Sequence, residues 1–272
     1  MLIKFTAIIA TFNSENTIER CIKSILSQDY ELFEIIVVDN KSSDETITKA
    51  KNFIDSRIVY ISEQDSGIYD AWNKALNIST GNIIHFIGSD DFLYNNSVYS
   101  NVLKRIDFFN IPDALCTSIH ILNNKMTLLN KLHPKSGIKD DQLMQPFMGI
   151  FFNKKIFTIL GGFDSDYKIC GDYEFMLRFG RLFTESIEKE IISINMLIGG
   201  VSSNFKTSHI LSREIFKSTY ENRSYLNIFL VILILIKTHV YKFLYEIFGF
   251  KITAKVIDFS RLIIGKDKYW KR

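Results

Sequence analysis

Strand-like and helix-like patterns alternate along about the first hundred residues, and this alternation constrains the fold more than any other feature of the sequence. Four runs of apolar and β-branched residues have the length of buried strands: 3–10, 33–39, 57–62 and 82–88. Between them, apolar residues recur at helical spacing, as at Ile18, Ile22 and Ile25, and a helix is expected over 68–78, closed by Gly81. Strands that are apolar on both faces and alternate with helices predict an α/β fold with a mostly parallel sheet flanked by helices.

The rest of the chain shows a looser pattern. Three further elements are expected: a strand at 116–122, a strand running into a helix at 148–157, and a helix at 171–183. With 272 residues and 47% hydrophobic content, the chain can bury a large core. We expect one domain over residues 1–220, with halves at about 1–110 and 111–220, and a hydrophobic and basic helical tail over 221–272.

This tail joins an apolar run to a basic segment. Residues 226–236 form an apolar run of eleven, broken only by Asn227, and this is shorter than the ~20 residues that cross a bilayer. Residues 237–272 carry nine Lys or Arg against three acids, a net charge of +6. Aromatic and aliphatic residues mixed with Lys and Arg are typical of helices at a membrane surface. We expect attachment to the inner face of the cytoplasmic membrane; a C-terminal helix packed on the domain is the alternative.

The cysteines and the N-terminus indicate a cytoplasmic protein, peripheral to that membrane. Cys21, Cys116 and Cys170 lie far apart without paired spacing, which argues against disulfides and against a thiolate metal site. The first apolar run is broken by Lys4 and lacks a cleavage site, so we expect a strand rather than a signal peptide. The five histidines show no zinc spacing, and His85, inside a strand-like run, is expected to be structural.

Polar clusters follow each of the first four strand-like runs, where open parallel sheets bind their ligands. The sharpest is "FIGSDD", in which Asp90 and Asp91 end an apolar run. Adjacent carboxylates repel each other and are costly to bury unless a cation or several donors meet them. Mg²⁺ and Mn²⁺ bind carboxylate and phosphate oxygens, so a metal site is one interpretation. A solvated turn, with an Asp capping the next helix, is the other.

Two more clusters could belong to a nucleotide site. Asp39 ends the second strand-like run, where it is either a turn residue or an acceptor for a ribose or base, and Thr11 and Asn13 could line the same pocket. Three polar residues, Asp70, Asn73 and Lys74, share one face of the helix expected over 68–78. That face is either simply solvated or places the lysine near phosphates.

A last acid stands at the start of the helix expected over 171–183. Asp172 follows Gly171 and is either a helix cap or a general base toward an incoming hydroxyl.

The sequence contains no Gly-x-x-x-x-Gly-Lys-Ser/Thr loop, no Gly-x-Ser-x-Gly elbow and no Gly-x-Gly-x-x-Gly fingerprint. Its chemistry is therefore expected at the strand ends.

Taken together, "AIIATFN", "EIIVVDNKSSDET", "QDSGIYDAWNKAL", "FIGSDD" and "GGFD...GDYEF" resemble the inverting glycosyltransferases of family two, which have the GT-A fold. The motifs follow the family's order from about residue 3 to residue 180. The sequence looks closest to bacterial enzymes that build lipid-linked surface polysaccharides such as O-antigens, capsules and exopolysaccharides.

The resemblance implies a role for each acid. Thr11 and Asp39 would contact the nucleotide base, Asp90 the ribose, and Asp91 an Mn²⁺ or Mg²⁺ ion on the diphosphate. Asp172 would be the catalytic base that takes the proton of the acceptor hydroxyl. The implied partners are a nucleotide-sugar donor, with UDP the expected nucleotide, and a lipid-linked saccharide acceptor; no nucleic acid is expected.

Some positions depart from the family's usual pattern. Asn40 and Gly171 stand where relatives often have acids, and Met148-Gly149 stands where many have His-Gln. These departures keep open a non-catalytic protein that binds a nucleotide sugar or a membrane surface. A nucleotidyltransferase would need a Gly-rich basic loop near the N-terminus, which "ATFNSENTIER" does not provide.

Overall fold

The computed structural model describes residues 2–107, 109–135, 146–199, 207–222 and 228–263. The chain divides into two compact units, residues 1–198 and 199–272, and each is described by itself.

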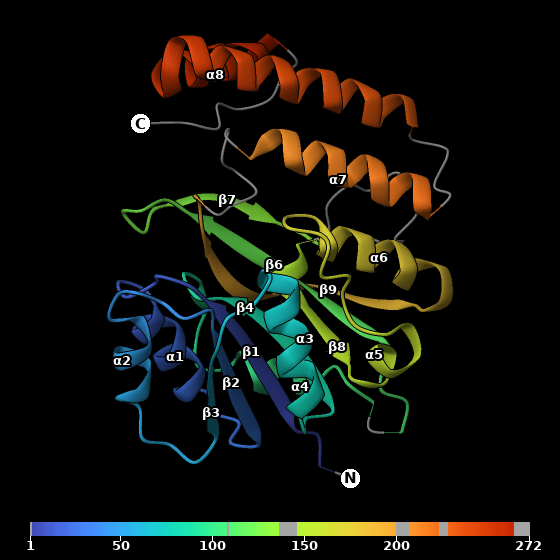
Figure 1. Cartoon of the computed structure of the whole chain (residues 1–272). Coiled ribbons are helices and arrows are strands. Elements are labelled where there is room, and N and C mark those ends of the chain that lie inside the picture. Colours follow the sequence, from blue (N-terminus) through green and yellow to red (C-terminus); the bar gives the residue numbers. More distant parts are fainter. Residues whose placement is uncertain (1, 108, 136–145, 200–206, 223–227, 264–272) are drawn as a thin grey trace. The chain divides into compact units, whose positions relative to one another are not determined.

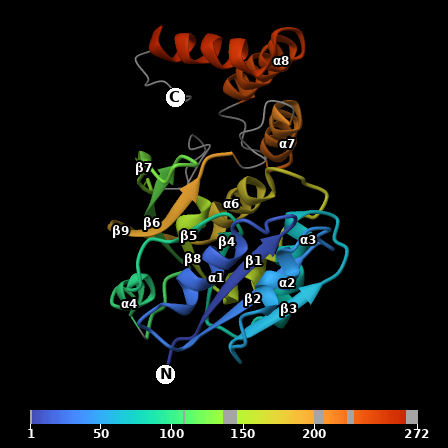
Figure 2. The ribbon, with the colours of Figure 1, turned by 90° about the vertical axis from the view of Figure 1, so that its left-hand side faces the viewer.

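The first unit is built on a sheet whose first half consists of four parallel strands. In sheet order these are β3 (Ile58–Ser62), β2 (Phe33–Asp39), β1 (Phe5–Thr11) and β4 (Ile83–Gly88). They alternate along the chain with α1 (Ile18–Leu26), α2 (Thr46–Lys51) and α3 (Ile68–Ile78). Figure 1 shows α1 and α2 on one side of these strands and α3 on the other, and Figure 2 views the side of α1 and α2. The α/β alternation expected from the sequence is confirmed.

The second half of the sheet is mixed. After β4 the order continues with β8 (Ile150–Asn153), β6 (Ala114–Leu122), β9 (Glu185–Leu197) and β5 (Phe92–Leu93), while β7 (Leu128–Leu132) pairs with β6. β8 runs antiparallel to both β4 and β6, whereas β9 is parallel to β6. Four more short elements complete this part: α4 (Val98–Leu103), η1 (Phe147–Gly149), α5 (Lys155–Leu160) and α6 (Gly171–Leu182).

Each face of the sheet has its own core. On one face, alternate residues of β1 such as Phe5 and Ile9 pack in one cluster with Ile22 of α1 and Tyr99 of α4. On the other face, Trp72 of α3 forms an aromatic cluster with residues of β4, η1 and the segment before α6: Phe86, Phe147 and Phe163. This second cluster fixes α3 over the strands that end at the polar clusters.

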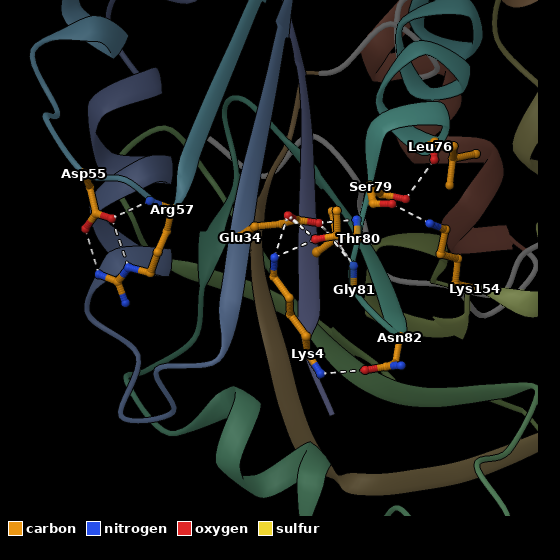
Figure 3. A network of polar contacts seen from close by, with 11 residues as sticks. Lys4, Glu34, Asp55, Arg57, Leu76, Ser79, Thr80, Gly81, Asn82 and Lys154 are labelled. Atoms are coloured by element: carbon orange, nitrogen blue, oxygen red, sulfur yellow. Dashed lines mark hydrogen bonds and ion pairs between the residues drawn. The ribbon is translucent and has the colours of Figure 1, made fainter. Parts of the chain in front are cut away.

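A buried carboxylate ties together the amino-terminal ends of the parallel strands (Figure 3). Glu34, only 8% exposed, accepts hydrogen bonds from Thr6 Oγ1, Lys4 Nζ and both the backbone N–H and the hydroxyl of Thr80, at 2.6 to 2.8 Å. Burial alone would raise its pKa, but these donors outweigh burial and lower the pKa of Glu34 to about 2. A Cβ on Gly81 would lie 2.5 Å from Thr6 Oγ1, so glycine lets the chain approach this network.

The second unit is helical. α7 (Ser208–Glu221) packs against α8 (Ile228–Ile263), which is broken at Gly249, where φ is 69°. α7 therefore belongs with the tail, although the sequence analysis placed residues up to 220 in the first domain. Within the part of the chain that the structure describes, no helix is long and apolar enough to cross a membrane. Leu226 and Asn227 of the apolar run, and the last nine residues, lie outside the described residues.

Candidate active site

The parallel strands end together, and their last residues lie side by side. Thr11 of β1 is in register with Asp39 of β2, Asp39 with Ser62 of β3, and Ala10 with Gly88 of β4. Hydrogen bonds also join the loops that follow: Ser14 Oγ lies 2.8 Å from Ser89 Oγ, and Asp65 N donates to Asn40 Oδ1 at 2.8 Å. The four polar clusters of the sequence thus meet at one edge of the sheet.

Thr11, Asn13 and Asp39 form the part of this edge on β1 and β2. Asp39 is fully buried and accepts hydrogen bonds from Ser42 and from Ser62 Oγ, which fixes the loop after β2. Asn13 is exposed, has a φ of 48°, and accepts a hydrogen bond from Ser43 N. Thr11 Oγ1 is buried and has no hydrogen-bond partner among the residues described. A buried hydroxyl without a partner is unfavourable, so a ligand that reached Thr11 would gain a hydrogen bond there.

The two adjacent acids after β4 differ in their surroundings. Asp91 is only 3% exposed, and its Oδ1 accepts a hydrogen bond from Leu197 N at the end of β9. Burial first, and then the neighbouring Asp90, raise the pKa of Asp91 well above its ordinary value. Asp90 is partly exposed, and its carboxylate has no hydrogen-bond partner in the described part of the chain. Asp90 is therefore the acid that a ligand reaches more readily.

Gly88 shows that the two carboxylates converge. A Cβ built on this glycine would lie 2.7 Å from Asp91 Oδ2 and 3.0 Å from Asp90 Oδ1. Two carboxylate oxygens that approach the same point repel each other, and a divalent cation would remove that repulsion. The residues thus fit a hard cation. In the described residues no group of three or more His, Cys, Asp or Glu is arranged to hold one, so phosphate or water oxygens would have to complete its coordination.

Arg20 is a site residue that the sequence analysis missed. It lies on α1, donates from Nη2 to the carbonyl of Asp90 at 2.6 Å, and its guanidinium lies 4.7 Å from the ring centre of Phe92. Its positive charge lowers the pKa of Asp91, against the larger effects of burial and of Asp90. Arg20 lies on the polar face of α1, away from Ile18, Ile22 and Ile25, so helical spacing does not mark it as a site residue.

Asp70, Asn73 and Lys74 of α3 are engaged with the protein itself. Asp70 Oδ2 accepts from Ser66 N at 2.9 Å, and Lys74 Nζ donates to Gln64 O at 2.9 Å and pairs with Glu63. The amide of Asn73 makes two hydrogen bonds of 2.8 Å with the backbone of Phe163, one through Nδ2 and one through Oδ1. These side chains hold the loops before α3 and before α6.

Asp172 lies in the first turn of α6 and is partly exposed. Its Oδ1 accepts a hydrogen bond from Tyr173 N at 2.9 Å and lies 3.1 Å from the hydroxyl of Tyr69. Lys168, four residues earlier, donates to Ser66 O at 2.9 Å. Since Tyr69 and Ser66 stand at the start of α3, directly after the loop that follows β3, these contacts bring Asp172 to the same edge of the sheet. Sequence analysis took no account of Tyr69.

The departures at Asn40, Met148 and Gly149 have structural roles here. Asn40 Oδ1 holds the loop after β3 through Asp65 N. The carbonyl of Met148 lies 2.8 Å from His85 Nε2, and a Cβ on Gly149 would lie 2.8 Å from Thr117 O. His85 is buried and stacks on Phe151 at 4.0 Å, in line with the structural role expected for it.

The sequence of this chain matches the model of a known protein family. The model of glycosyl transferase family 2 matches residues 6–154. A PGL/p-HBAD biosynthesis glycosyltransferase of Mycobacterium tuberculosis is 27% identical over 220 residues, which are 77% of this chain and 83% of that protein. The UDP-Glc:alpha-D-GlcNAc-diphosphoundecaprenol beta-1,3-glucosyltransferase WfgD of Escherichia coli is 31% identical over 165 residues, 54% of this chain and 64% of WfgD.

Solved structures show the same fold. S. aureus TarS 1-349 in complex with UDP-GlcNAc aligns with a TM-score of 0.66 and 17% identity, covering 95% of this chain and 77% of that chain. The mannosyltransferase PcManGT from Pyrobaculum calidifontis, in complex with GDP-Man and Mn²⁺, aligns with a TM-score of 0.62 and 15% identity, covering 97% and 81%. At these identities the likeness concerns the fold, and it confirms the expected GT-A architecture.

Proposed function

Because the chain belongs to glycosyl transferase family 2, we propose that it moves a sugar from a nucleotide-diphosphate donor to a hydroxyl of a lipid-linked saccharide, with inversion at the anomeric carbon. A UDP-sugar is the donor we favour, given the names of WfgD and of the TarS complex. The product would enter a surface polysaccharide such as an O-antigen, a capsule or an exopolysaccharide. The observation that carries the proposal is the convergence of Thr11, Asp39 and the Asp90–Asp91 pair at one sheet edge.

The donor side of the site rests on β1 and β2. Thr11 and Asp39 would contact the nucleotide base, and Asn13 would line the same pocket. The buried Thr11 hydroxyl supports this, because a base could supply the partner that it lacks among the described residues. Asp70, Asn73 and Lys74 would border the donor pocket, and their hydrogen bonds to Ser66, Phe163 and Gln64 would hold the surrounding loops in place.

A divalent metal ion, Mn²⁺ or Mg²⁺, fits the acid pair. The family resemblance gives the ion to Asp91 and the ribose to Asp90. The convergence of both carboxylates over Gly88 supports a shared role, with the accessible Asp90 also within reach of the ion. Bound there, the ion would offset negative charge on the departing nucleoside diphosphate, and PcManGT with Mn²⁺ is a precedent in the fold.

Asp172 is the proposed general base. Its carboxylate would accept the proton of the acceptor hydroxyl while that oxygen bonds to the anomeric carbon and the bond from this carbon to the diphosphate breaks. A single displacement of this kind inverts the anomeric configuration. The partial exposure of Asp172 leaves the carboxylate accessible to an acceptor.

A lipid-linked acceptor would lie at a membrane, and the exposed side chains of α8 suit a membrane surface. Exposed apolar side chains follow one another at helical spacing before Gly249 and again after it: Ile232, Ile236, Val240, Phe243 and Ile247, then Ile252, Val256 and Phe259. Lys251 and Lys255 are exposed in the second stretch. An exposed apolar stripe flanked by lysines is typical of a helix at an anionic membrane surface, so we propose peripheral attachment to the inner face of the cytoplasmic membrane.

The enzymatic proposal is tested by screening nucleotide sugars for transfer and for donor hydrolysis, with and without Mn²⁺. We expect one UDP-sugar to be consumed, and we expect Asp172→Asn to lose transfer by a factor of about 10² or more while the fold is kept. Asp166→Asn is the matched control, because Asp166 is exposed and lies six residues earlier on the same segment. Full activity in Asp172→Asn would refute the assignment of the base.

The membrane proposal is tested with the full chain and anionic vesicles. Replacing Phe243 and Ile247 by Glu should release the protein from sedimenting vesicles, because two charges enter the apolar stripe. Ile54→Glu is the control, since Ile54 is 99% exposed but lies in the first unit. Equal sedimentation of the stripe variant and the wild type would show that the stripe does not bind the membrane.

A further inference from the structure

We propose that Tyr69 is a positioning residue for the general base: its hydroxyl holds the Asp172 carboxylate in place and keeps it ionised for the reaction. This inference rests on the proposed function, in which Asp172 takes the acceptor's proton. It assigns a role to a buried aromatic residue of α3.

The contacts of Tyr69 carry the inference. Its side chain is 3% exposed, and its hydroxyl lies 2.7 Å from Ile169 O and 3.1 Å from Asp172 Oδ1. One phenolic group thus contacts both ends of the four-residue segment that leads into α6. Because the ring packs edge-to-face on Trp72, with centroids 5.4 Å apart, and tilted against Phe163 at 5.8 Å, the hydroxyl is held in a fixed position.

Gly171 shows that the fold accommodates this tyrosine at the base itself. A Cβ on Gly171 would lie 2.8 Å from two ring atoms of Tyr69. Any side chain at position 171 would therefore push the ring away from Asp172. This gives a physical reason for the glycine: the tyrosine ring occupies the space beside the base.

The chemistry of a phenol suits both protonation states of the base. Burial first, and then the charge of Asp172, raise the pKa of Tyr69 well above its ordinary value, so the hydroxyl keeps its proton. While Asp172 is a carboxylate, the single hydroxyl proton is shared between two acceptors, Ile169 O at 2.7 Å and Asp172 Oδ1 at 3.1 Å. When Asp172 has taken the acceptor's proton, the same oxygen can accept a hydrogen bond from the carboxyl group and donate to Ile169 O instead. The base can change its charge without moving the loop.

Other ionisable groups lie near Asp172, and the Tyr69→Phe variant leaves them unchanged. Cys170 precedes Asp172 in the same loop and is buried, and Lys168 reaches Ser66 O from that loop. Within α6, Glu174 is paired with Arg178 at 2.7 Å. Removing the Tyr69 hydroxyl changes none of these charges, so a shift in the titration of Asp172 would report the lost hydrogen bond.

The test is the pH profile of kcat/KM for Tyr69→Phe, with the sugar donor found in the screen. We expect kcat to fall about tenfold and the acid limb to move up by about one pH unit, because a neutral donor to the carboxylate is lost. The KM for the donor should stay the same, since Tyr69 is 3% exposed and its hydroxyl contacts Ile169 O and Asp172. Tyr99→Phe is the control: Tyr99 is fully buried, and its hydroxyl has no partner among the described residues.

The outcomes separate this inference from the proposed function. If the wild type is active and Asp172→Asn is not, but the acid limb of Tyr69→Phe stays where it was, the positioning role is wrong and the base assignment stands. Activity in Asp172→Asn would refute both the assignment of the base and the positioning role of Tyr69. If Tyr69→Phe folds poorly, Gly171→Ala gives a second test, because displacement of the ring should move the acid limb in the same direction. An unmoved limb in that variant would also overturn the inference.

Discussion

Replacement of Glu34 by Gln removes the charge at the centre of the network that joins the starts of β1, β2 and β4. The pKa of Glu34 falls from 4.5 to about 2 on folding because its donors outweigh burial. At about 1.4 kcal/mol per pKa unit, this pKa difference corresponds to at most about 3.5 kcal/mol of stabilisation. Since the Gln carbonyl still accepts from some of the donors, we expect a loss of about 2 kcal/mol at pH 7.

The sign of the pH dependence follows from a folded pKa that lies below the unfolded one. The stabilisation by Glu34 is complete above about pH 4.5 and is lost as the pH falls toward 2. Urea unfolding of the wild type and of Glu34→Gln should therefore give a difference at pH 7 that shrinks steadily below pH 4.5. A difference that is the same at pH 3 as at pH 7 would refute the reasoning.

Asp55 provides a matched control from the same region (Figure 3). Its pKa is also lowered to about 2, chiefly by the Arg57 side chain at 2.8 Å. However, the two residues are neighbours in one turn, and the Asp55 side chain is 25% exposed. We expect Asp55→Asn to cost less than about 1 kcal/mol.

Three further predictions concern tightly packed or buried positions. Gly162→Ala should lower stability by about 1–3 kcal/mol in thermal unfolding, because its Cβ would lie 2.2 Å from Asn73 Oδ1; an unchanged Tm would contradict this. Burial lowers the pKa of His85 to about 4, so its NMR resonances should titrate near pH 4, and a midpoint above pH 6 would show that the ring is accessible. Burial also raises the thiol pKa of Cys21 and, to about 12, of Cys116; thiol reagents at pH 8 should modify them only after unfolding, and reaction of the folded protein would count against this.

The parallel half of the sheet was predictable because β1, β2 and β4 are buried on both faces and read as continuous apolar runs. The expected runs at 33–39 and 68–78 coincide with β2 and α3, and the other strands differ by a residue or two at their ends. β9 escaped prediction since its first half, "ESIEKE", is charged and only partly buried. Its pairing with β6, a long-range contact, decides its conformation rather than any local pattern.

The candidate site was predictable to the same degree as the strands that carry it. Thr11, Asp39 and the acid pair lie at the strand ends because parallel strands bring their carboxyl ends to one edge. The contacts of Asn73 could not be foreseen, because its partner, Phe163, comes from a loop ninety residues away. In the same way, Asp91 accepts its hydrogen bond from Leu197 N, which lies 106 residues later in the chain.

The hydrogen bond from Leu197 N to Asp91 also has a consequence for protein engineering. Leu197 is the second-last residue of the first unit, which ends at Ile198. A fusion or a shortened chain designed at this boundary would alter the end of β9, whose backbone donates a hydrogen bond to the buried Asp91. The junction between the units is therefore a poor place to cut, because a chain that ends two residues before Ile198 would lack the backbone donor to Asp91.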